Sequence, residues 1–161
     1  MVRKISSMVA GVTLLLVGGL AFAADTAPSP FIGTWVLNVS KSKFEGAPAV
    51  KSYSITISDA GGGKLHNVAQ WVEGSGAKGQ SEYTASADGK PTPVTGYANA
   101  DAVVVRSKDP RSTHMSMLKG GKEVEWGRYK VSADGKTMHG TEGGTDETGT
   151  KYKWTEFFEK Q

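Results

Sequence analysis

From Phe31 onward the chain alternates apolar and polar residues with a period of two, and no stretch shows the apolar period of a helix. Residues 51–58 are the clearest case, because Tyr53, Ile55 and Ile57 fall on one face while serines and a threonine fall on the other. Clusters of Gly, Asp, Asn and Pro separate these segments, as is typical where strands reverse direction. The pattern predicts an antiparallel all-β domain.

About nine strands are expected, and most of them are joined by short hairpins. The expected strands are residues 31–39, 51–58, 64–72, 79–86, 102–107, 112–118, 122–131, 136–141 and 149–159. An up-and-down meander of this length is expected to close into a barrel of about eight to ten strands, because closure removes exposed sheet edges. A two-sheet sandwich is the alternative.

The first 23 residues have the composition of a secretory signal peptide. Arg3 and Lys4 precede an apolar run at residues 9–22, and Ala23 completes an A-x-A cleavage motif. The alternative is a membrane anchor, but the run is shorter than the ~20 residues that span a bilayer. We therefore expect cleavage after Ala23 and a periplasmic or secreted protein that is not associated with a membrane.

The chain is expected to comprise a signal peptide at 1–23, an extended segment at 24–30 and one barrel domain at 31–161. Without the leader it carries 17 basic and 16 acidic residues, and it contains no cysteine. Interspersed charges do not favour a nucleic-acid partner, which would need a basic patch. The fold must be stabilised by its core rather than by disulfides, and the composition indicates no particular oligomeric state.

Sequence motifs of three kinds bear on possible chemistry, namely a glycine-rich motif, the histidines and nucleophile motifs, and none of them predicts a cofactor or a reaction. Residues 74–79 match G-x-G-x-x-G, but a strand follows where a dinucleotide site requires a helix. His66, His114 and His139 lie on separate segments without the spacing of metal ligands. The sequence has no G-x-S-x-G motif and no cysteine nucleophile. We expect no metal, no cofactor and no enzymatic activity.

The opening of the first strand is Phe31-Ile32-Gly33-Thr34-Trp35. It resembles the Gly-x-Trp signature of the calycin superfamily, which includes the lipocalins and the fatty-acid-binding proteins, and it is similar to the start of small exported bacterial proteins of unassigned function. The resemblance implies a lipocalin-like barrel in which Trp35 plugs one end and Gly33 allows close approach of the backbone.

The end of the chain, residues 155–160, reads Thr-Glu-Phe-Phe-Glu-Lys and is similar to the closing Thr-Arg-x-Tyr-Glu-Lys of the fatty-acid-binding proteins. Glu156 stands where that family has its carboxylate-binding Arg, and Phe158 stands where it has the partner Tyr. Residues 40–50 are also too few for that family's two helices. The resemblance therefore implies a lipocalin-like barrel in the broad sense, without that family's fatty-acid headgroup site.

Strand parity brings one set of residues toward the interior as candidate ligand-binding residues. This set comprises Trp35, Tyr53, Trp126, Arg128, Tyr152, Trp154 and Glu156. Arg128 and Glu156 each continue an apolar face, where an unpaired charge is costly, so the two are expected to lie within reach of each other. They would either neutralise each other or form the polar anchor of a pocket. The alternative places both charges on the surface.

Two function classes are consistent with this pattern. The first is an exported module that binds a small apolar or amphipathic molecule, and the second is a structural or interaction protein whose barrel is filled by its own side chains. An outer-membrane barrel is a third class, disfavoured by short strands and by the lack of an aromatic girdle. The first class is the leading hypothesis, and the filled barrel is the alternative.

Overall fold

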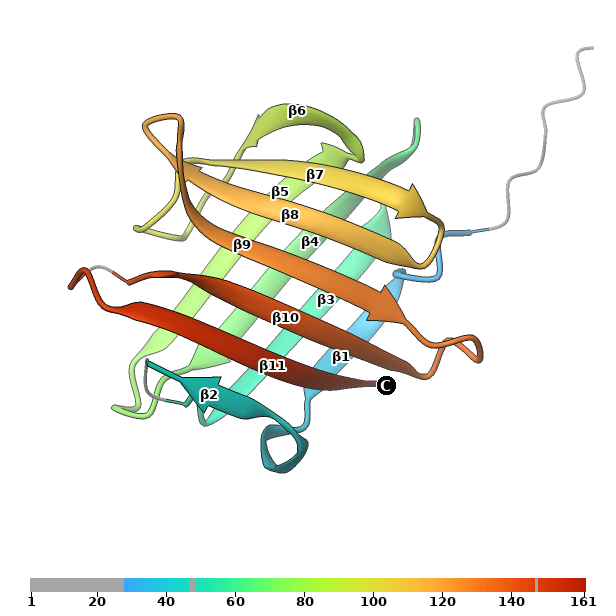
Figure 1. The fold of residues 1–161 in the computed structure, drawn as a ribbon. Coiled ribbons are helices and arrows are strands. Elements are labelled where there is room, and N and C mark those ends of the chain that lie inside the picture. Colours follow the sequence, from blue (N-terminus) through green and yellow to red (C-terminus); the bar gives the residue numbers. More distant parts are fainter. Residues whose placement is uncertain (1–27, 47–48, 147) are drawn as a thin grey trace, which may run out of the picture.

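The computed structural model describes residues 28–46, 49–146 and 148–161, which form eleven strands and one short 3-10 turn (Figure 1). In chain order these are β1 (Gly33–Leu37), η1 (Val39–Lys41), β2 (Lys43–Glu45), β3 (Ser52–Asp59), β4 (Lys64–Val72), β5 (Lys78–Ser86), β6 (Asp88–Pro93), β7 (Ala102–Asp109), β8 (Ser112–Lys119), β9 (Lys122–Val131), β10 (Thr137–Thr145) and β11 (Lys151–Lys160).

The expected signal peptide, residues 1–23, and residues 24–27 of the segment after it lie outside the described residues. Among the residues described, none forms a helix with the length and hydrophobicity that a membrane-spanning helix needs.

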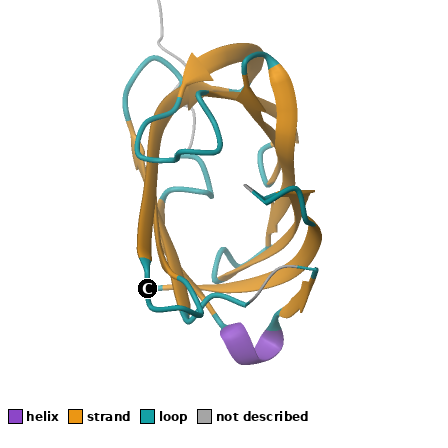
Figure 2. Cartoon of the chain, turned by 90° about the vertical axis from the view of Figure 1, so that its left-hand side faces the viewer, coloured by secondary structure: helices purple, strands orange, loops and turns teal. Residues whose placement is uncertain are grey.

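The strands form a nearly closed antiparallel barrel. Their order is β5-β4-β3-β1-β11-β10-β9-β8-β7-β6, with β2 added beside β11. The two ends of this path meet where Glu82 and Thr95 exchange backbone hydrogen bonds of 2.9 and 3.0 Å. Figure 2 shows the strands as a flattened ring. The predicted all-β, up-and-down barrel is confirmed.

Two short strands were not expected from the sequence. β2 lies in a segment too short to show an alternation, and β6 begins at Asp88 and Gly89, residue types that are typical of a turn between strands. The turn does exist locally, because Asp88 Oδ1 accepts a hydrogen bond from the backbone N–H of Lys90 and the register shifts before Pro91. Proline cannot donate to a ladder, and β6 lies at the end of the sheet path, where this is tolerated.

Trp35 lies in the core, in β1, as the resemblance implied. It has no exposed surface, and it pairs with Ile55 of β3 on one side and with Lys160 of β11 on the other. The Lys160 ammonium lies 5.0 Å from the centre of the Trp35 ring. Gly33 has φ of 136°, and a Cβ there would overlap the Lys160 side chain, so glycine is what permits this packing.

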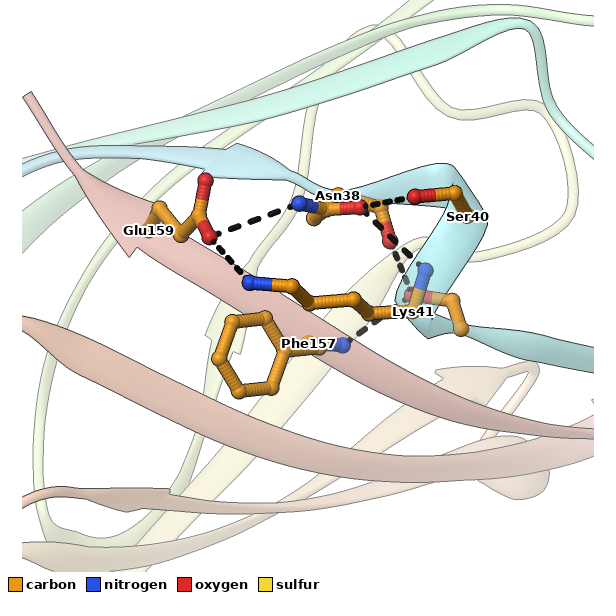
Figure 3. A network of polar contacts seen from close by, with 6 residues as sticks. Asn38, Ser40, Lys41, Phe157 and Glu159 are labelled. Carbon is orange, nitrogen blue, oxygen red and sulfur yellow. Dashed lines mark hydrogen bonds and ion pairs between the residues drawn. The ribbon is translucent and has the colours of Figure 1, made fainter.

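A polar network fixes the turn after β1 against β11 (Figure 3). Asn38 Oδ1 accepts hydrogen bonds from the backbone N–H of Lys41 and from the Ser40 hydroxyl. Asn38 is thus the N-cap of η1. Lys41 Nζ lies 2.9 Å from Glu159 Oε1 and 4.7 Å from the centre of the Phe157 ring. Residues on the exposed face of β11 therefore hold the start and the end of the domain together.

Candidate ligand-binding cavity

The barrel encloses a cavity of about 620 Å³. Its walls are mostly apolar and aromatic, and they include Tyr53, Trp71, Met115, Met117, Tyr152 and Trp154. The loop residues that line it include 73–75, 96–99, 146 and 148, from the β4–β5, β6–β7 and β10–β11 connections. These loops lie at the left in Figure 1, the end that faces the viewer in Figure 2, and we call this end the mouth.

Aromatic rings meet edge to face along one wall of the cavity. Tyr53 lies 6.3 Å from Trp71 between ring centres, and Trp71 lies 5.7 Å from Tyr97. The Trp71 indole covers Gly79, its partner on β5, where a Cβ would lie only 2.1 Å from the ring. A glycine at this inward position therefore makes room for the indole on the wall.

Three buried carboxyl groups enter the barrel interior from three neighbouring strands. Glu125 of β9, Glu142 of β10 and Glu156 of β11 are 6%, 5% and 1% exposed. Glu125 and Glu142 line the cavity. The register places Glu125 opposite Gly144 and Glu156 opposite Gly140, so the three acids run diagonally across the sheet with Glu142 in the middle.

Tyrosine hydroxyls donate hydrogen bonds to two of these carboxyl groups. Tyr97 and Tyr152 each donate to Glu125 Oε2 at 2.8 Å, and Tyr129 donates to Glu142 Oε2 at 2.6 Å. The pKa of each of these three hydroxyls is raised, first by burial and then by the nearby carboxylates, so the tyrosines keep the protons that they donate.

Glu156 differs from the other two acids, because neither of its carboxyl oxygens has a hydrogen-bond partner among the described residues. The carboxyl group lies over Gly140 and next to the Tyr129 ring. The indole Nε1 of Trp154, a residue that lines the cavity, is likewise buried without an acceptor in the described part of the chain. Unsatisfied buried groups of this kind are rare in folded proteins and call for an explanation.

Burial raises the pKa of all three glutamates. For Glu156 it reaches about 8, with the Glu125 charge adding to the effect of burial. The Tyr97 and Tyr152 hydrogen bonds offset the rise for Glu125 only in part, and the pKa of Glu142 is raised further by the charges of the other two acids. The cavity is lined by no lysine or arginine in the described residues. The interior is thus acidic and lacks a basic partner of its own.

The structure brings together part of the predicted set of site residues. Tyr53, Tyr152 and Trp154 line the cavity. Glu156 lies inside the barrel but beside Tyr129 rather than on the cavity wall. Trp35 is a core residue whose indole bonds to the backbone and does not line the cavity.

The predicted pairing of Arg128 with Glu156 is wrong. Arg128 is exposed and its guanidinium lies 5.5 Å from the centre of the Trp126 ring, on the outer face of β9. Glu156 is in the interior, so the sheet separates the two charges. The Trp126 indole packs on Gly143, its outward-facing partner on β10, where a Cβ would lie 2.9 Å from the ring. The aromatic residue taken as inward therefore covers a glycine on the outside.

The parity of β9 explains this error. Its inward positions are Glu125, Gly127, Tyr129 and Val131, the opposite set to the one expected. A register shift between Met117 and Leu118 on β8 places a bulge near Val124, which is half-buried against the core although its neighbour Glu125 faces inward. Sequence reasoning therefore missed Glu125, and it also missed Glu142 on β10. The sequence signal for an inward Glu125 was the pair Tyr129 and Val131, which occupy the same face of β9 as Glu125.

The comparisons place few constraints on this protein. No protein-family model matches the sequence, and no curated protein matches it. Among solved structures, the chain is similar to that of the siderocalin Ex-FABP, which is described as functioning through dual ligand specificities. The two are 12% identical with a TM-score of 0.37, over 83% of this chain and 75% of that one.

Proposed function

We propose that this chain is an exported, lipocalin-like binding protein that holds one small amphipathic molecule inside its barrel. The observation that carries the proposal is the cavity of about 620 Å³, whose walls are largely apolar with a few polar groups converging on it. This volume and lining are typical of small-molecule sites. A barrel with a purely structural role would be expected to fill its interior, because protein cores leave few voids larger than a water molecule.

The mouth supplies the proposed entry path. Asn99 of the β6–β7 loop lines the cavity and donates a hydrogen bond of 3.1 Å to the Thr145 carbonyl at the end of β10. This contact bridges the cavity-lining loops on two sides of the mouth. A ligand that enters here meets Tyr97 and Tyr152 and then the carboxyl group they share, Glu125.

Binding rather than catalysis is proposed, since the sequence has no cysteine and no G-x-S-x-G motif. The proposed location is the periplasm or the medium, and the signal-peptide pattern of residues 1–23 supports it. A nucleic-acid partner is not proposed, because positive and negative charges are evenly mixed along the sequence. Intact-mass measurement of exported protein tests the location. A mature chain beginning at Ala24 is expected, and a mass that retains residues 1–23 contradicts the cleavage.

The binding proposal is tested with the neutral fluorophore N-phenyl-1-naphthylamine. We expect its emission to rise on binding to the wild type and to be lost in Ala69→Phe, because Ala69 is a small residue of the cavity wall. Gln70→Phe, the same change at the exposed neighbouring position of β4, is the matched control and should bind as the wild type does. Far-UV spectra establish that both variants fold.

Native mass spectrometry of protein purified from its own host supplies the second measurement, and a co-purifying small molecule is expected. The proposal fails if no adduct travels with the protein and the fluorophore either does not bind or binds Ala69→Phe as well as it binds the wild type. A filled or inaccessible barrel would give this result.

A further inference from the structure

We propose that the molecule held in this cavity is an organic cation, a protonated amine on an apolar body, with its charged head held between the carboxylates of Glu125 and Glu142. The inference rests on the proposed function and names the class of its ligand.

The arrangement of acids across three strands is the first step of the argument. Glu142 lies between Glu125 and Glu156 on the inward diagonal of β9, β10 and β11, and the positions flanking it on β10 are Gly140 and Gly144. Diagonal neighbours on one sheet face are about 7–8 Å apart, within reach for long side chains. Both glycines are covered by neighbouring polar side chains, since a Cβ at Gly140 would lie 2.7 Å from Glu156 Oε2 and one at Gly144 would lie 3.0 Å from the Tyr152 hydroxyl. The absence of a side chain at these two positions therefore lets the polar groups pack closely around Glu142.

The partners of the acids give the second step. The tyrosine hydrogen bonds to Glu125 and Glu142 all end on Oε2 of each residue, so Oε1 of each remains for a further donor. Glu156 is 1% exposed and neither of its oxygens has a hydrogen-bond partner within the described part of the chain, and its charge acts on Tyr53 and Tyr129, which line the cavity. A buried carboxyl group either stays protonated or ionises beside a counter-charge, and the lining residues described supply no lysine or arginine, so a bound cation is what would let these acids ionise.

The walls decide which kind of cation fits. Tyr97 and Tyr152, which bond to Glu125, pack against Trp71 and Trp154 with ring centres 5.7 and 5.2 Å apart. Aromatic faces stabilise a cationic head that is removed from water. A bare metal ion would leave most of the 620 Å³ and its apolar lining unused. An anionic ligand would be repelled by the same carboxylates. An ammonium head with an apolar body uses both the charge and the volume.

The test compares three probes that share one body and differ only in the head group. Calorimetric titration at neutral pH with 4-phenylbutylamine, 4-phenylbutanol and 4-phenylbutanoate should show the amine binding at least about tenfold more tightly than the alcohol, with the carboxylate weakest. If the alcohol or the carboxylate binds as tightly as the amine, the cation assignment is wrong while the binding function stands. If none of the three binds although N-phenyl-1-naphthylamine binds the wild type and not Ala69→Phe, the cation assignment is wrong while the binding function stands. If the fluorophore and the native mass measurement also fail, both are wrong.

Variants assign the head group to its residues. Glu125→Gln and Glu142→Gln should each weaken amine binding by about tenfold or more and change alcohol binding by less than about twofold. Glu123→Gln, on the same strand but exposed, removes the same formal charge and should change neither. Glutamine keeps the size and an acceptor for the tyrosine hydroxyls, so folding is expected to persist. Unchanged amine binding in both interior variants overturns the proposal.

Discussion

The indole Nε1 of Trp35 donates a 2.8 Å hydrogen bond to the carbonyl oxygen of Phe31, which lies four residues earlier in the chain and is also buried in the core. The side chain thus fixes the backbone that leads into β1 as well as filling the core. Trp35→Ala should lower the free energy of unfolding by about 3–5 kcal/mol, measured by chemical denaturation. Val36→Ala, at the neighbouring exposed position, is the control and should cost about 0.5 kcal/mol or less. An unchanged midpoint for Trp35→Ala would contradict this role.

Glu156 should make the stability of the protein fall as pH rises. Burial raises its pKa from 4.5 to about 8, so the folded state binds the extra proton between these values. This contribution is fully present below pH 4.5 and is lost as pH rises through 8. The cost from this group amounts to about 3 kcal/mol between pH 5 and pH 8.

Glu156→Gln should therefore flatten the pH dependence of the free energy of unfolding. Glu159→Gln on the same strand is the control, because Lys41 lowers the pKa of that exposed carboxyl, which gives an effect of the opposite sign. Parallel pH profiles for the wild type and Glu156→Gln would mean that the acid is not buried.

Gly140 should not tolerate a methyl group. A Cβ there would lie 2.7 Å from Glu156 Oε2 and 2.8 Å from Tyr129 Cε1, inside the barrel. Gly140→Ala is expected to destabilise the fold by about 1–3 kcal/mol, because two buried side chains must shift. Thr141→Ala, at the adjacent outward position, should change thermal stability little. Equal melting temperatures for the two variants would show that the interior at this point is loosely packed.

Arg128 should have no part in ligand binding. Its guanidinium stacks on Trp126 outside the barrel, so Arg128→Ala should leave the affinity for 4-phenylbutylamine within about twofold of the wild type. A tenfold loss of this affinity, measured by calorimetric titration, would show that Arg128 takes part in binding. It would contradict the outward position of Arg128 on β9.

The network after β1 should be stabilised more by its cap than by its ion pair. Asn38→Ala removes the acceptor for the Lys41 backbone N–H and should cost about 1 kcal/mol in urea denaturation. Lys41→Met removes the exposed ion pair with Glu159 and should cost about 0.5 kcal/mol or less, in line with other surface pairs. The reverse order of effects would indicate that the ion pair, and not the cap, holds the turn.

The fold could be predicted from sequence wherever one strand face is consistently apolar. β3 shows this most clearly, since Tyr53, Ile55 and Ile57 face inward as the alternation indicated. β2 and β6 could not be predicted in the same way. β2 has three residues and pairs with β11, far along the chain. β6 has six residues and pairs with the next strand, β7, but its register shifts between Asp88 and Pro91 and its Asp, Gly and Pro residues are typical of turns.

The site was less accessible to sequence reasoning, because its polar residues break the usual rule that glutamates are exposed. Glu125 and Trp126 are adjacent, and β9 carries two conflicting signals, because Val124 and Trp126 favour one parity while Tyr129 and Val131 favour the other. The pairing of Trp126 with Gly143 agrees with the second. That pairing follows from the register of β9 and β10, which the composition of either strand does not contain. Glu156 was placed in the interior correctly because β11 keeps its alternation from Tyr152 to Phe158.

The position of β1 between β3 and β11 also determines when the barrel can be completed. Residues 35–37 have their second set of ladder partners in residues 158–160. The backbone N–H of Gln161 also donates a hydrogen bond to the Thr34 carbonyl. The pairing of β1, which is synthesised early, is thus completed only by β11. A nascent or truncated chain that ends before β11 presents an unpaired edge on β1, so the barrel closes only after β11 has been synthesised.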